Sequence, residues 1–181
     1  TTPKPLVNVA GKPIVERLVE DIAEVCEAKI EEIAFVISPH FGKAVEERLI
    51  EVAQRLGAKG VIAYQKEALG TAHAVMCAKE QLTGPTIIAF ADTLFKADFK
   101  LDEDKDGIIW VKKIHDPRQF GVVKLNEANE ITEYVEKPEE FVSDLAMIGI
   151  YYFKDGEALR AECQKLIDDD IMKGGEYQYP D

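Results

Sequence analysis

The stretch IAFVISPHFGKAVEERLIEVAQRLGAKGVIAYQ (residues 33–65) decides the fold, because its hydrophobic pattern changes period twice. It begins with IAFVIS (33–38), a continuous apolar run of strand length. Apolar residues then recur at helical spacing over residues 41–56, and Gly57 is a suitable residue to end a helix. A second apolar run, GVIAYQ (60–65), follows. The stretch therefore predicts a strand–helix–strand unit.

The same alternation extends to both sides of this unit. Apolar residues at helical spacing predict a helix over Pro13–Ala28, with Pro13 in its first turn, and another over Thr71–Leu82. The apolar run TIIAFAD predicts a third strand over Thr86–Asp92. Strands that are apolar throughout are typical of parallel strands covered on both faces. The first half therefore predicts a doubly wound α/β layer.

In the second half, strands no longer alternate with helices. Four strand-like runs follow with short connections, and they read GIIWVKKI, FGVVKLN, ITEYVEK and AMIGIYYF. Residues 126–130 (NEANE) join two of them as a hairpin-like loop, and a last helix is expected over Asp155–Asp170. The expected fold class is α/β: a Rossmann-like three-layer sandwich with a mixed, mainly parallel central sheet, in a single domain over residues 1–181. The first half of this sheet is expected to be parallel and the second half more antiparallel.

Composition excludes several classes of function. The 181 residues carry a formal net charge of −12, whereas a nucleic-acid-binding surface needs a basic footprint, so we expect no nucleic-acid partner. No run of about 18 apolar residues occurs, and the first residues lack the pattern of a signal peptide, so we expect no membrane partner. Cys26, Cys77 and Cys163 are widely spaced on apolar helix faces and are interpreted as buried free thiols of a reducing cytoplasm.

Ligands of open α/β sheets bind at the carboxyl ends of the strands, so polar residues that directly follow a strand are site candidates. Gln65 follows the second strand, and its amide can pair with both a donor and an acceptor. Gly70 would allow close approach to the backbone before a helix begins at Thr71. The alternative is an ordinary turn with Thr71 as the helix cap. His73 lies inside this helix and receives no chemical role.

Three charged residues are further candidates. Asp92 ends an apolar strand and is either a cap or a ligand for Mg²⁺ on phosphates. Lys4 and Lys137 each precede a proline, which favours extended backbone and holds the side chain outward. Two such lysines in one cleft would suit two phosphates, although each taken singly also fits an ordinary surface lysine.

The chain resembles the sugar-1-phosphate nucleotidyltransferases, also called nucleoside-diphosphate-sugar pyrophosphorylases. The resemblance rests on five motifs in the family's order: PKPLVNVAGKPIVERLVEDI, QKEALGTAHAV, TIIAFAD, DPRQFGVVKLNEANEITEYVEKP and IGIYYF. Together they extend from Thr2 to about Phe153. The LGTAHA variant is similar to glucose-1-phosphate thymidylyl- and uridylyltransferases and to the uridylyltransferase domain of the N-acetylglucosamine-1-phosphate enzyme.

On the nucleotide side, the resemblance implies that Lys4 binds the phosphates of the triphosphate. Gln65, together with Gly70 and Thr71, would read the pyrimidine base. Asp92 would hold Mg²⁺, which is the implied cofactor. Ala91 precedes Asp92 here, where the family more commonly has glycine.

On the sugar side, the resemblance implies that Gly121 lets the sugar lie against the backbone. Glu136 would accept hydrogen bonds from sugar hydroxyls, and Lys137 would bind the phosphate of the sugar 1-phosphate. The implied catalytic group is Lys4, Asp92 and Lys137. The family's Gly-rich loop with its catalytic Arg and its second metal-binding Asp are expected to be missing, the first before Thr2 and the second at the other end.

The implied reaction transfers a nucleotidyl group from a nucleoside triphosphate, dTTP or UTP, to a sugar 1-phosphate such as glucose 1-phosphate, forming a nucleotide sugar and pyrophosphate. Two alternatives stay open: a non-catalytic regulatory domain that binds nucleotide or sugar phosphate, and a cytidylyl- or guanylyltransferase on the same fold. Thymine and uracil differ by one methyl group, so the sequence leaves the base open, and it leaves homo-oligomerisation open as well.

Overall fold

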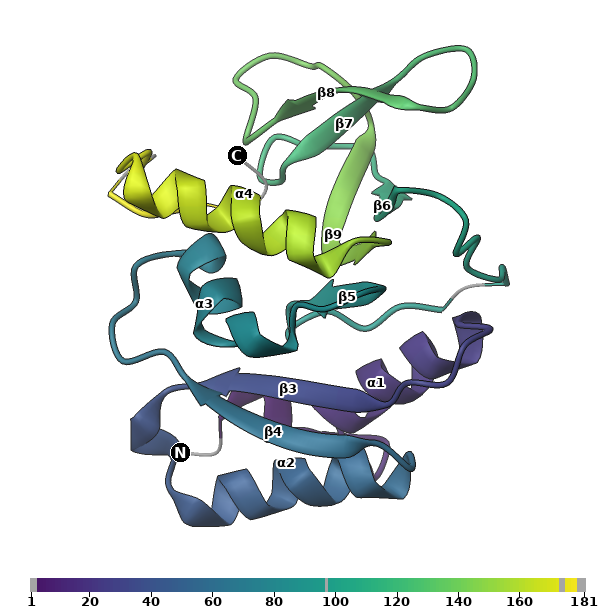
Figure 1. Ribbon diagram of the computed structural model, residues 1–181. Helices are drawn as coiled ribbons and strands as arrows, with labels where there is room; N and C mark the ends of the chain where they lie inside the picture. Colours follow the sequence, from purple (N-terminus) through teal and green to yellow (C-terminus); the bar gives the residue numbers. More distant parts are fainter. Residues whose placement is uncertain (1–2, 97, 173–174, 179–181) are drawn as a thin grey trace.

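The computed structural model describes residues 3–96, 98–172 and 175–178 (Figure 1). Its helices are η1 (Lys4–Leu6), α1 (Ile14–Val25), η2 (Pro39–Phe41), α2 (Lys43–Arg55), α3 (Thr71–Cys77), η3 (Lys79–Gln81) and α4 (Gly156–Asp168). Its strands are β1 (Asn8–Val9), β2 (Lys12–Pro13), β3 (Glu32–Ile37), β4 (Lys59–Tyr64), β5 (Thr86–Ala89), β6 (Gly107–Lys113), β7 (Val122–Leu125), β8 (Ile131–Val135) and β9 (Leu145–Phe153).

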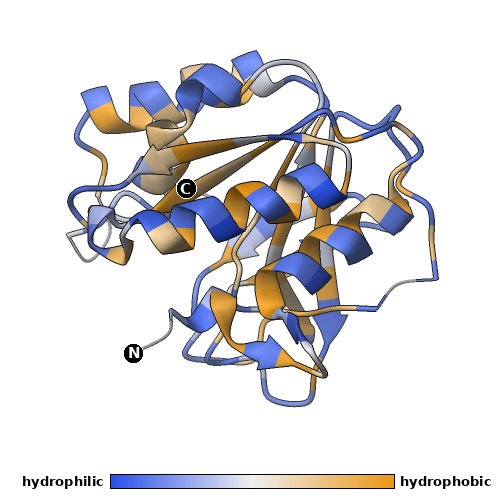
Figure 2. Cartoon of the chain, turned by 90° about the horizontal axis from the view of Figure 1, so that it is seen from below, coloured by the Kyte–Doolittle hydropathy of each residue, from blue (hydrophilic) through white to orange (hydrophobic). Residues whose placement is uncertain are grey.

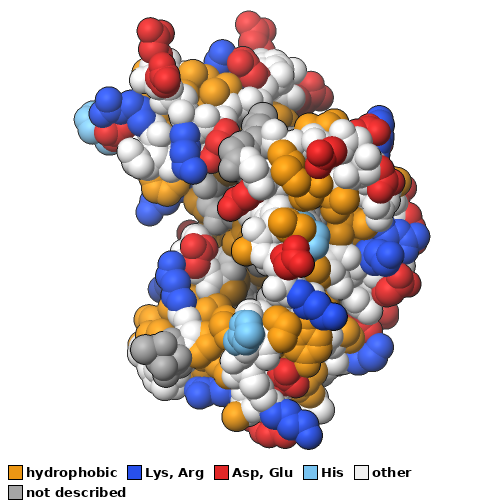
Figure 3. Space-filling view, turned by 90° about the vertical axis from the view of Figure 1, so that its left-hand side faces the viewer, with side chains coloured by type: hydrophobic (Ala, Val, Ile, Leu, Met, Phe, Trp, Pro, Cys, Tyr) orange, Lys and Arg blue, Asp and Glu red, His pale blue; other side chains and the backbone are white. Residues whose placement is uncertain are grey.

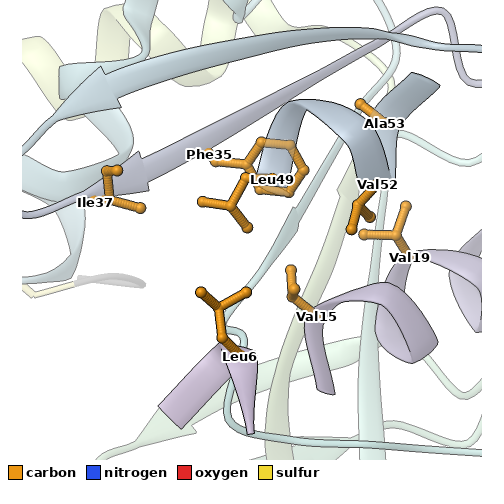
Figure 4. Close-up of a cluster of buried hydrophobic side chains, with 8 residues drawn as sticks. All are labelled: Leu6, Val15, Val19, Phe35, Ile37, Leu49, Val52 and Ala53. Carbon is orange, nitrogen blue, oxygen red and sulfur yellow. The ribbon is translucent and has the colours of Figure 1, made fainter. Parts of the chain in front are cut away.

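The strand–helix–strand unit predicted over residues 33–65 is confirmed. Strands β3 and β4 pair in parallel, from Glu32 opposite Lys59 to Ile37 opposite Tyr64, and α2 connects them. Gly57 ends the crossover helix with a positive φ of 72°, a conformation that costs glycine little. Figure 4 shows the core of this unit, in which side chains of η1, α1, β3 and α2 converge. These side chains are Leu6, Val15, Val19, Phe35, Ile37, Leu49, Val52 and Ala53.

The expectation of a mainly parallel central sheet is wrong for the described residues. The largest sheet has five strands in the order β5-β9-β7-β8, with β6 paired to β9, and all of its pairs are antiparallel. A strand that is apolar throughout indicates that both of its faces are buried, but not whether it runs parallel or antiparallel to its neighbours, which explains the error. Strand β5 is apolar throughout because helices cover both of its faces, although its partner runs in the opposite direction.

Strand β9 organises the second half. Strand β6 pairs with one edge of β9 along its whole length. The other edge of β9 pairs with β5 at one end and with β7 at the other. Gly149 lies between those two ends with a φ of 80°, and the register of β6 shifts opposite it, between Ile109 and Val111. The bend at Gly149 allows β9 to pair with β5 at one end and with the β7–β8 hairpin at the other.

Helix α1 joins the two sheets into one body. Its residues Val15 and Val19 pack against β3 and α2, whereas Leu18 and Ile22 pack against Trp110 and other residues of the five-stranded sheet. On the opposite face, α3 and α4 pack together over β5 and β9. Figure 2 shows the resulting pattern, with hydrophobic stripes along the helices and hydrophobic strands between them. The predicted mixed α/β fold is present, but its strands form separate small sheets.

Some element boundaries differ from the prediction. The helix expected over residues 71–82 ends at Cys77 and is followed by the short turn η3, and the strand expected to reach Asp92 ends at Ala89. Gly70, with φ 107° and ψ 179°, caps α3, so Thr71 is the first helical residue and not the cap. Pro13 likewise precedes α1 as its cap.

The three cysteines are free thiols, as predicted, but only Cys163 is fully buried, whereas Cys26 and Cys77 are half-buried. Burial raises the pKa of the Cys163 thiol to about 11, with a smaller contribution from Glu162. Among the described helices, none is long and apolar enough to cross a bilayer.

Candidate functional site

A cavity of about 460 Å³ lies beyond the carboxyl ends of β3, β4 and β5, where the topology of an α/β sheet places ligands. Three residues proposed from the sequence, Lys4, Gln65 and Asp92, line it together. The remaining lining residues come from η1, from the end of β3 and from the segments that follow β3, β4 and β5. They are Pro5, Val36, Ile37, Ser38, Phe41, Lys66, Ala68 and Ala91. The fold therefore collects, around one cavity, residues that the sequence separates widely.

Lys4 and Asp92 contact each other at the edge of this cavity. The Nζ of Lys4 lies 3.5 Å from Oδ2 of Asp92, and the two side chains are 66% and 58% exposed. An exposed ion pair of this length contributes little stability, so each group is readily available to another partner. A polyanion would compete for the ammonium, and a cation would compete for the carboxylate.

The backbone at both candidate lysines differs from the extended conformation expected before proline. Lys4 begins the 3₁₀ turn η1, which is closed by hydrogen bonds from Leu6 N to Pro3 O and from Val7 N to Lys4 O. Lys137 has a positive φ of 42°, held by a hydrogen bond from its own N–H to Phe120 O. A left-handed lysine is uncommon and costs free energy, and such residues concentrate at functional sites.

Gly70 is required by a contact that sequence reasoning missed. A Cβ atom at this position would lie 2.3 Å from the carbonyl oxygen of Tyr177, because the backbone near the end of the chain runs directly over it. Tyr177 N donates to Leu69 O, and Ala72 N donates to Tyr177 O. The space beside Gly70 is thus filled by Tyr177, and the N–H of Ala72 is already bound. Whether Gly70 also approaches a nucleotide stays a prediction.

His73, which received no role from the sequence, contacts Gln65. The Nε2 of Gln65 lies 3.2 Å from Nδ1 of His73 and donates to Gly70 O at 3.0 Å. The only sequence signal for this contact is that His73 lies one helical turn after Gly70, at the start of the helix that follows the Gln65 loop. Contact between loop and helix depends on how the loop folds back, which the sequence pattern does not specify.

The sugar-side candidates form a second group at the β7–β8 hairpin. A Cβ atom at Gly121 would lie 2.7 Å from Oε2 of Glu136, so the carboxylate packs directly over this glycine. Lys137 follows, with its Nζ 3.4 Å from Oε1 of Glu136. The structure therefore brings Gly121, Glu136 and Lys137 together, as the resemblance implies.

Tyr151 of β9 is a further polar residue beside this group. Burial raises the pKa of its hydroxyl to about 12, and the nearby carboxylate of Glu136 adds to the effect. Figure 3 shows the surface hollowed between the part built from β3, β4 and their helices and the part that carries the hairpin. The hydroxyl of Tyr151, which is buried, stays protonated at neutral pH.

The donor chemistry at Asp92 fits Mg²⁺. Among the described residues, no three His, Cys, Asp or Glu side chains cluster closely enough to hold a metal ion by themselves. Mg²⁺ at phosphate-transfer sites commonly takes only one or two carboxylates and completes its shell with water and substrate phosphates. A single exposed carboxylate at the edge of a cavity, as at Asp92, is compatible with that mode.

Comparison with known proteins identifies related sequences. The family model described as "Nucleotidyl transferase" matches residues 1–171. The chain is 32% identical over 171 residues to the mannose-1-phosphate guanylyltransferase catalytic subunit beta of Drosophila melanogaster, covering 90% of this chain and 45% of that protein. It is 32% identical over 155 residues to the bifunctional protein GlmU of Methanococcus vannielii, covering 82% of this chain and 35% of that protein. The chain thus spans less than half the length of these curated relatives.

A solved structure shares the fold. The nucleoside-diphosphate-sugar pyrophosphorylase from Vibrio cholerae superposes with a TM-score of 0.78 over 98% of this chain and 76% of that one, at 22% identity. At this level of identity the likeness is evidence for the fold alone.

Proposed function

Because the chain belongs to the nucleotidyl transferase family, we propose that the protein transfers a nucleotidyl group from a nucleoside triphosphate to a sugar 1-phosphate. UTP or dTTP is the proposed donor and glucose 1-phosphate the proposed acceptor, with residues 1–181 acting within one nucleotidyltransferase domain. The observation that carries the proposal is the cavity at the strand ends, lined by a lysine, an amide and a carboxylate. These are the group types that a triphosphate, a base edge and a phosphate-bound Mg²⁺ require.

In the proposed reaction, an oxygen of the sugar 1-phosphate forms a bond to the α-phosphorus of the triphosphate. The bond from that phosphorus to the oxygen bridging to the β-phosphate breaks, and its electron pair leaves with pyrophosphate. The attacking oxygen is already anionic, so the reaction needs no general base. The protein contributes alignment of the two phosphates and stabilisation of their negative charge.

Each proposed residue has a place in this scheme. Lys4 would leave Asp92 to bind the triphosphate, and the carboxylate of Asp92 would then be free to hold Mg²⁺, which when bound neutralises phosphate charge. Lys137 binds the phosphate of the acceptor, and Glu136 accepts hydrogen bonds from its hydroxyls. The overall charge of −12 repels both substrates, so local cations at the site are needed to offset it.

A second candidate is guanylyl transfer to mannose 1-phosphate. It is favoured by the relative at 32% identity whose name gives that activity. It is also compatible with Gln65, because the N1–H of guanine, like the N3–H of uracil, can donate to an amide oxygen.

The test is pyrophosphate release by the complete protein with Mg²⁺, using UTP, dTTP, GTP and CTP against glucose, N-acetylglucosamine and mannose 1-phosphates. We expect release with UTP or dTTP and glucose 1-phosphate, whereas release only with GTP and mannose 1-phosphate would establish the second candidate. If triphosphates bind but no pair releases pyrophosphate, the chain is a non-catalytic binding domain and the proposal fails.

Two lysine variants separate the substrates. Lys137→Ala should raise the KM for sugar 1-phosphate far more than that for the triphosphate. Lys59→Ala is the matched control, because Lys59 pairs with Glu32 at the opposite end of β4 from Gln65. An equal loss toward both substrates in Lys137→Ala would contradict the assigned role.

A further inference from the structure

The side-chain amide of Gln65 is held in one orientation. Its Nε2 donates to Gly70 O at 3.0 Å, and a carbonyl oxygen can only accept, so the atom that faces it is the nitrogen. The same nitrogen lies 3.2 Å from Nδ1 of His73. An amide nitrogen carries two protons, and these two acceptors use both. His73 therefore carries its own ring proton on Nε2 and accepts at Nδ1.

Only the oxygen of the amide remains for a ligand. Among residues 3–96, 98–172 and 175–178, no hydrogen bond to Oε1 of Gln65 is present. Gln65 is part-buried and lines the cavity. At Gln65 the site thus offers a ligand the acceptor Oε1 only. The donor Nε2, which a free glutamine would also supply, is already bound within the protein. The sequence left both the donor and the acceptor of this amide open to a ligand, whereas in the structure the donor is already bound.

A fixed acceptor distinguishes nucleobases by their edges. Uracil and thymine carry an N–H at N3, and guanine carries one at N1, so each of them can donate to Oε1. Cytosine at N3 and adenine at N1 carry a lone pair instead. That lone pair would face the amide oxygen, form no hydrogen bond with it and be repelled by it. Leaving buried polar groups unpaired is the means by which hydrogen-bonding sites reject analogues most strongly.

We propose that His73 is a positioning residue for base selection. By accepting the second amide proton of Gln65, His73 leaves Oε1 as the one atom of this amide that is offered to the base, and the site selects bases with an imino N–H. Without His73, the second proton would be free to serve a base that needs a donor. This inference rests on the proposed function, since it requires that the cavity takes a nucleobase.

The test measures binding of UTP and CTP to the complete protein by titration calorimetry. The wild-type protein should bind UTP about 100-fold more tightly than CTP, which is the order of ratio expected when a buried polar group is left without a hydrogen bond. His73→Phe keeps a ring but removes the acceptor and should reduce the ratio about tenfold. His73→Asn can place an oxygen near the position of Nδ1 and should retain it. An unchanged ratio in His73→Phe, or equal losses in both variants, overturns the proposal.

A second measurement needs no variant and so does not depend on how the variants fold. UTP methylated at N3 lacks the imino proton, and the wild-type protein should bind it about as weakly as CTP. Equal binding of UTP and its N3-methyl form would overturn the role of the fixed acceptor. Sugar 1-phosphate affinity should stay unchanged in His73→Phe, because a general structural defect would alter it as well.

The outcomes also separate this inference from the proposed reaction. If the base ratio behaves as expected but pyrophosphate is never released, nucleotidyl transfer fails and base selection stands. If pyrophosphate is released and the ratio is insensitive to His73, the reaction stands and the positioning role fails. If no triphosphate binds, both are overturned.

Discussion

At the scale of the residue, Gly70 shows how a distant segment determines one backbone position. The residue has φ 107° and ψ 179°, a region that only glycine adopts easily, and a Cβ atom would meet Tyr177 O at 2.3 Å. Gly70→Ala should therefore displace Tyr177 and disturb Gln65, whose amide binds Gly70 O. We expect a loss of more than about 3 kcal/mol in the free energy of unfolding and weaker triphosphate binding.

Gly42 provides the control for this variant. It precedes α2 as Gly70 precedes α3, with a similar conformation of φ 80° and ψ 167°, but nothing lies within 4 Å of an added Cβ. Gly42→Ala should cost only the backbone strain, about 1–3 kcal/mol, and leave nucleotide binding unchanged. Urea unfolding of both variants measures the difference. Equal losses of stability would show that Tyr177 yields without cost.

Lys137 lies in a strained conformation, so its charge and its backbone can be tested separately. Lys137→Gly removes the ammonium and relieves the positive φ of 42°, whereas Lys137→Ala removes the ammonium alone. Both should raise the KM for sugar 1-phosphate by about tenfold or more, equivalent to about 1.4 kcal/mol. Only Lys137→Gly should gain stability, by up to about 1 kcal/mol. Steady-state kinetics and thermal unfolding together give both readings, and a stabilised Lys137→Ala would contradict the strain argument.

Part of the candidate site follows from the sequence and part does not. That Gln65 and Asp92 line one cavity is predictable, because strand ends meet at one edge of an α/β sheet and local patterns locate those ends. Lys4 follows no strand, and only the family resemblance placed it beside them. The contact of Tyr177 with Gly70 is a pairing over a long sequence separation that no local pattern encodes. The partner of Gln65, His73, is missed for a related reason, since it depends on the path of the intervening loop.

At the scale of the element, α1 packs against both the β3–β4 sheet and the five-stranded sheet and holds them together. Its periodic apolar residues predict a helix but not that two faces of it are buried, one against β3 and α2 and the other against the sheet of β9. Leu18 belongs to the second face and is 2% exposed. Leu18→Ala should reduce the free energy of unfolding by about 2–5 kcal/mol, because a cavity opens between α1 and that sheet.

Glu24→Ala on the exposed side of the same helix is the control and should change stability by no more than about 0.5 kcal/mol. Both variants are compared in urea, where the slope with denaturant also reports whether unfolding stays a single transition. If Leu18→Ala costs as little as Glu24→Ala, α1 does not hold the five-stranded sheet in the way that its packing indicates.

Strand positions were more predictable than strand directions. A run such as residues 86–89 is recognisable because both of its faces are buried, between α1 on one side and α3 with α4 on the other. Its antiparallel partner β9 comes about sixty residues later, and nothing in the apolar pattern distinguishes it from a parallel one. Whether two strands run parallel or antiparallel depends on how the chain connects them. In the sequence, only the short connections of the second half indicated antiparallel pairing.

At the scale of the whole molecule, the proposed nucleotide site joins parts that are otherwise linked mainly by α1. The cavity is lined by η1, by the ends of β3 and β4, and by the segment after β5. A ligand bound there would contact all three, and because the unfolded chain offers no such site, binding adds to the stability of the folded molecule. Thermal unfolding therefore reports on the site without requiring catalysis.

The expected size of that effect follows from mass action. UTP at about 100 times its Kd should stabilise the protein by about 2.7 kcal/mol, which for a chain of this length raises Tm by about 5–10 °C. Lys4→Ala, if it weakens binding tenfold, should give about half of that gain at the same UTP concentration, because the stabilisation depends on the logarithm of the occupancy ratio. Lys59→Ala, at the far end of β4, should keep the full shift. An equal shift in wild type and Lys4→Ala would place the triphosphate elsewhere, since the ammonium beside Asp92 would then not contact it.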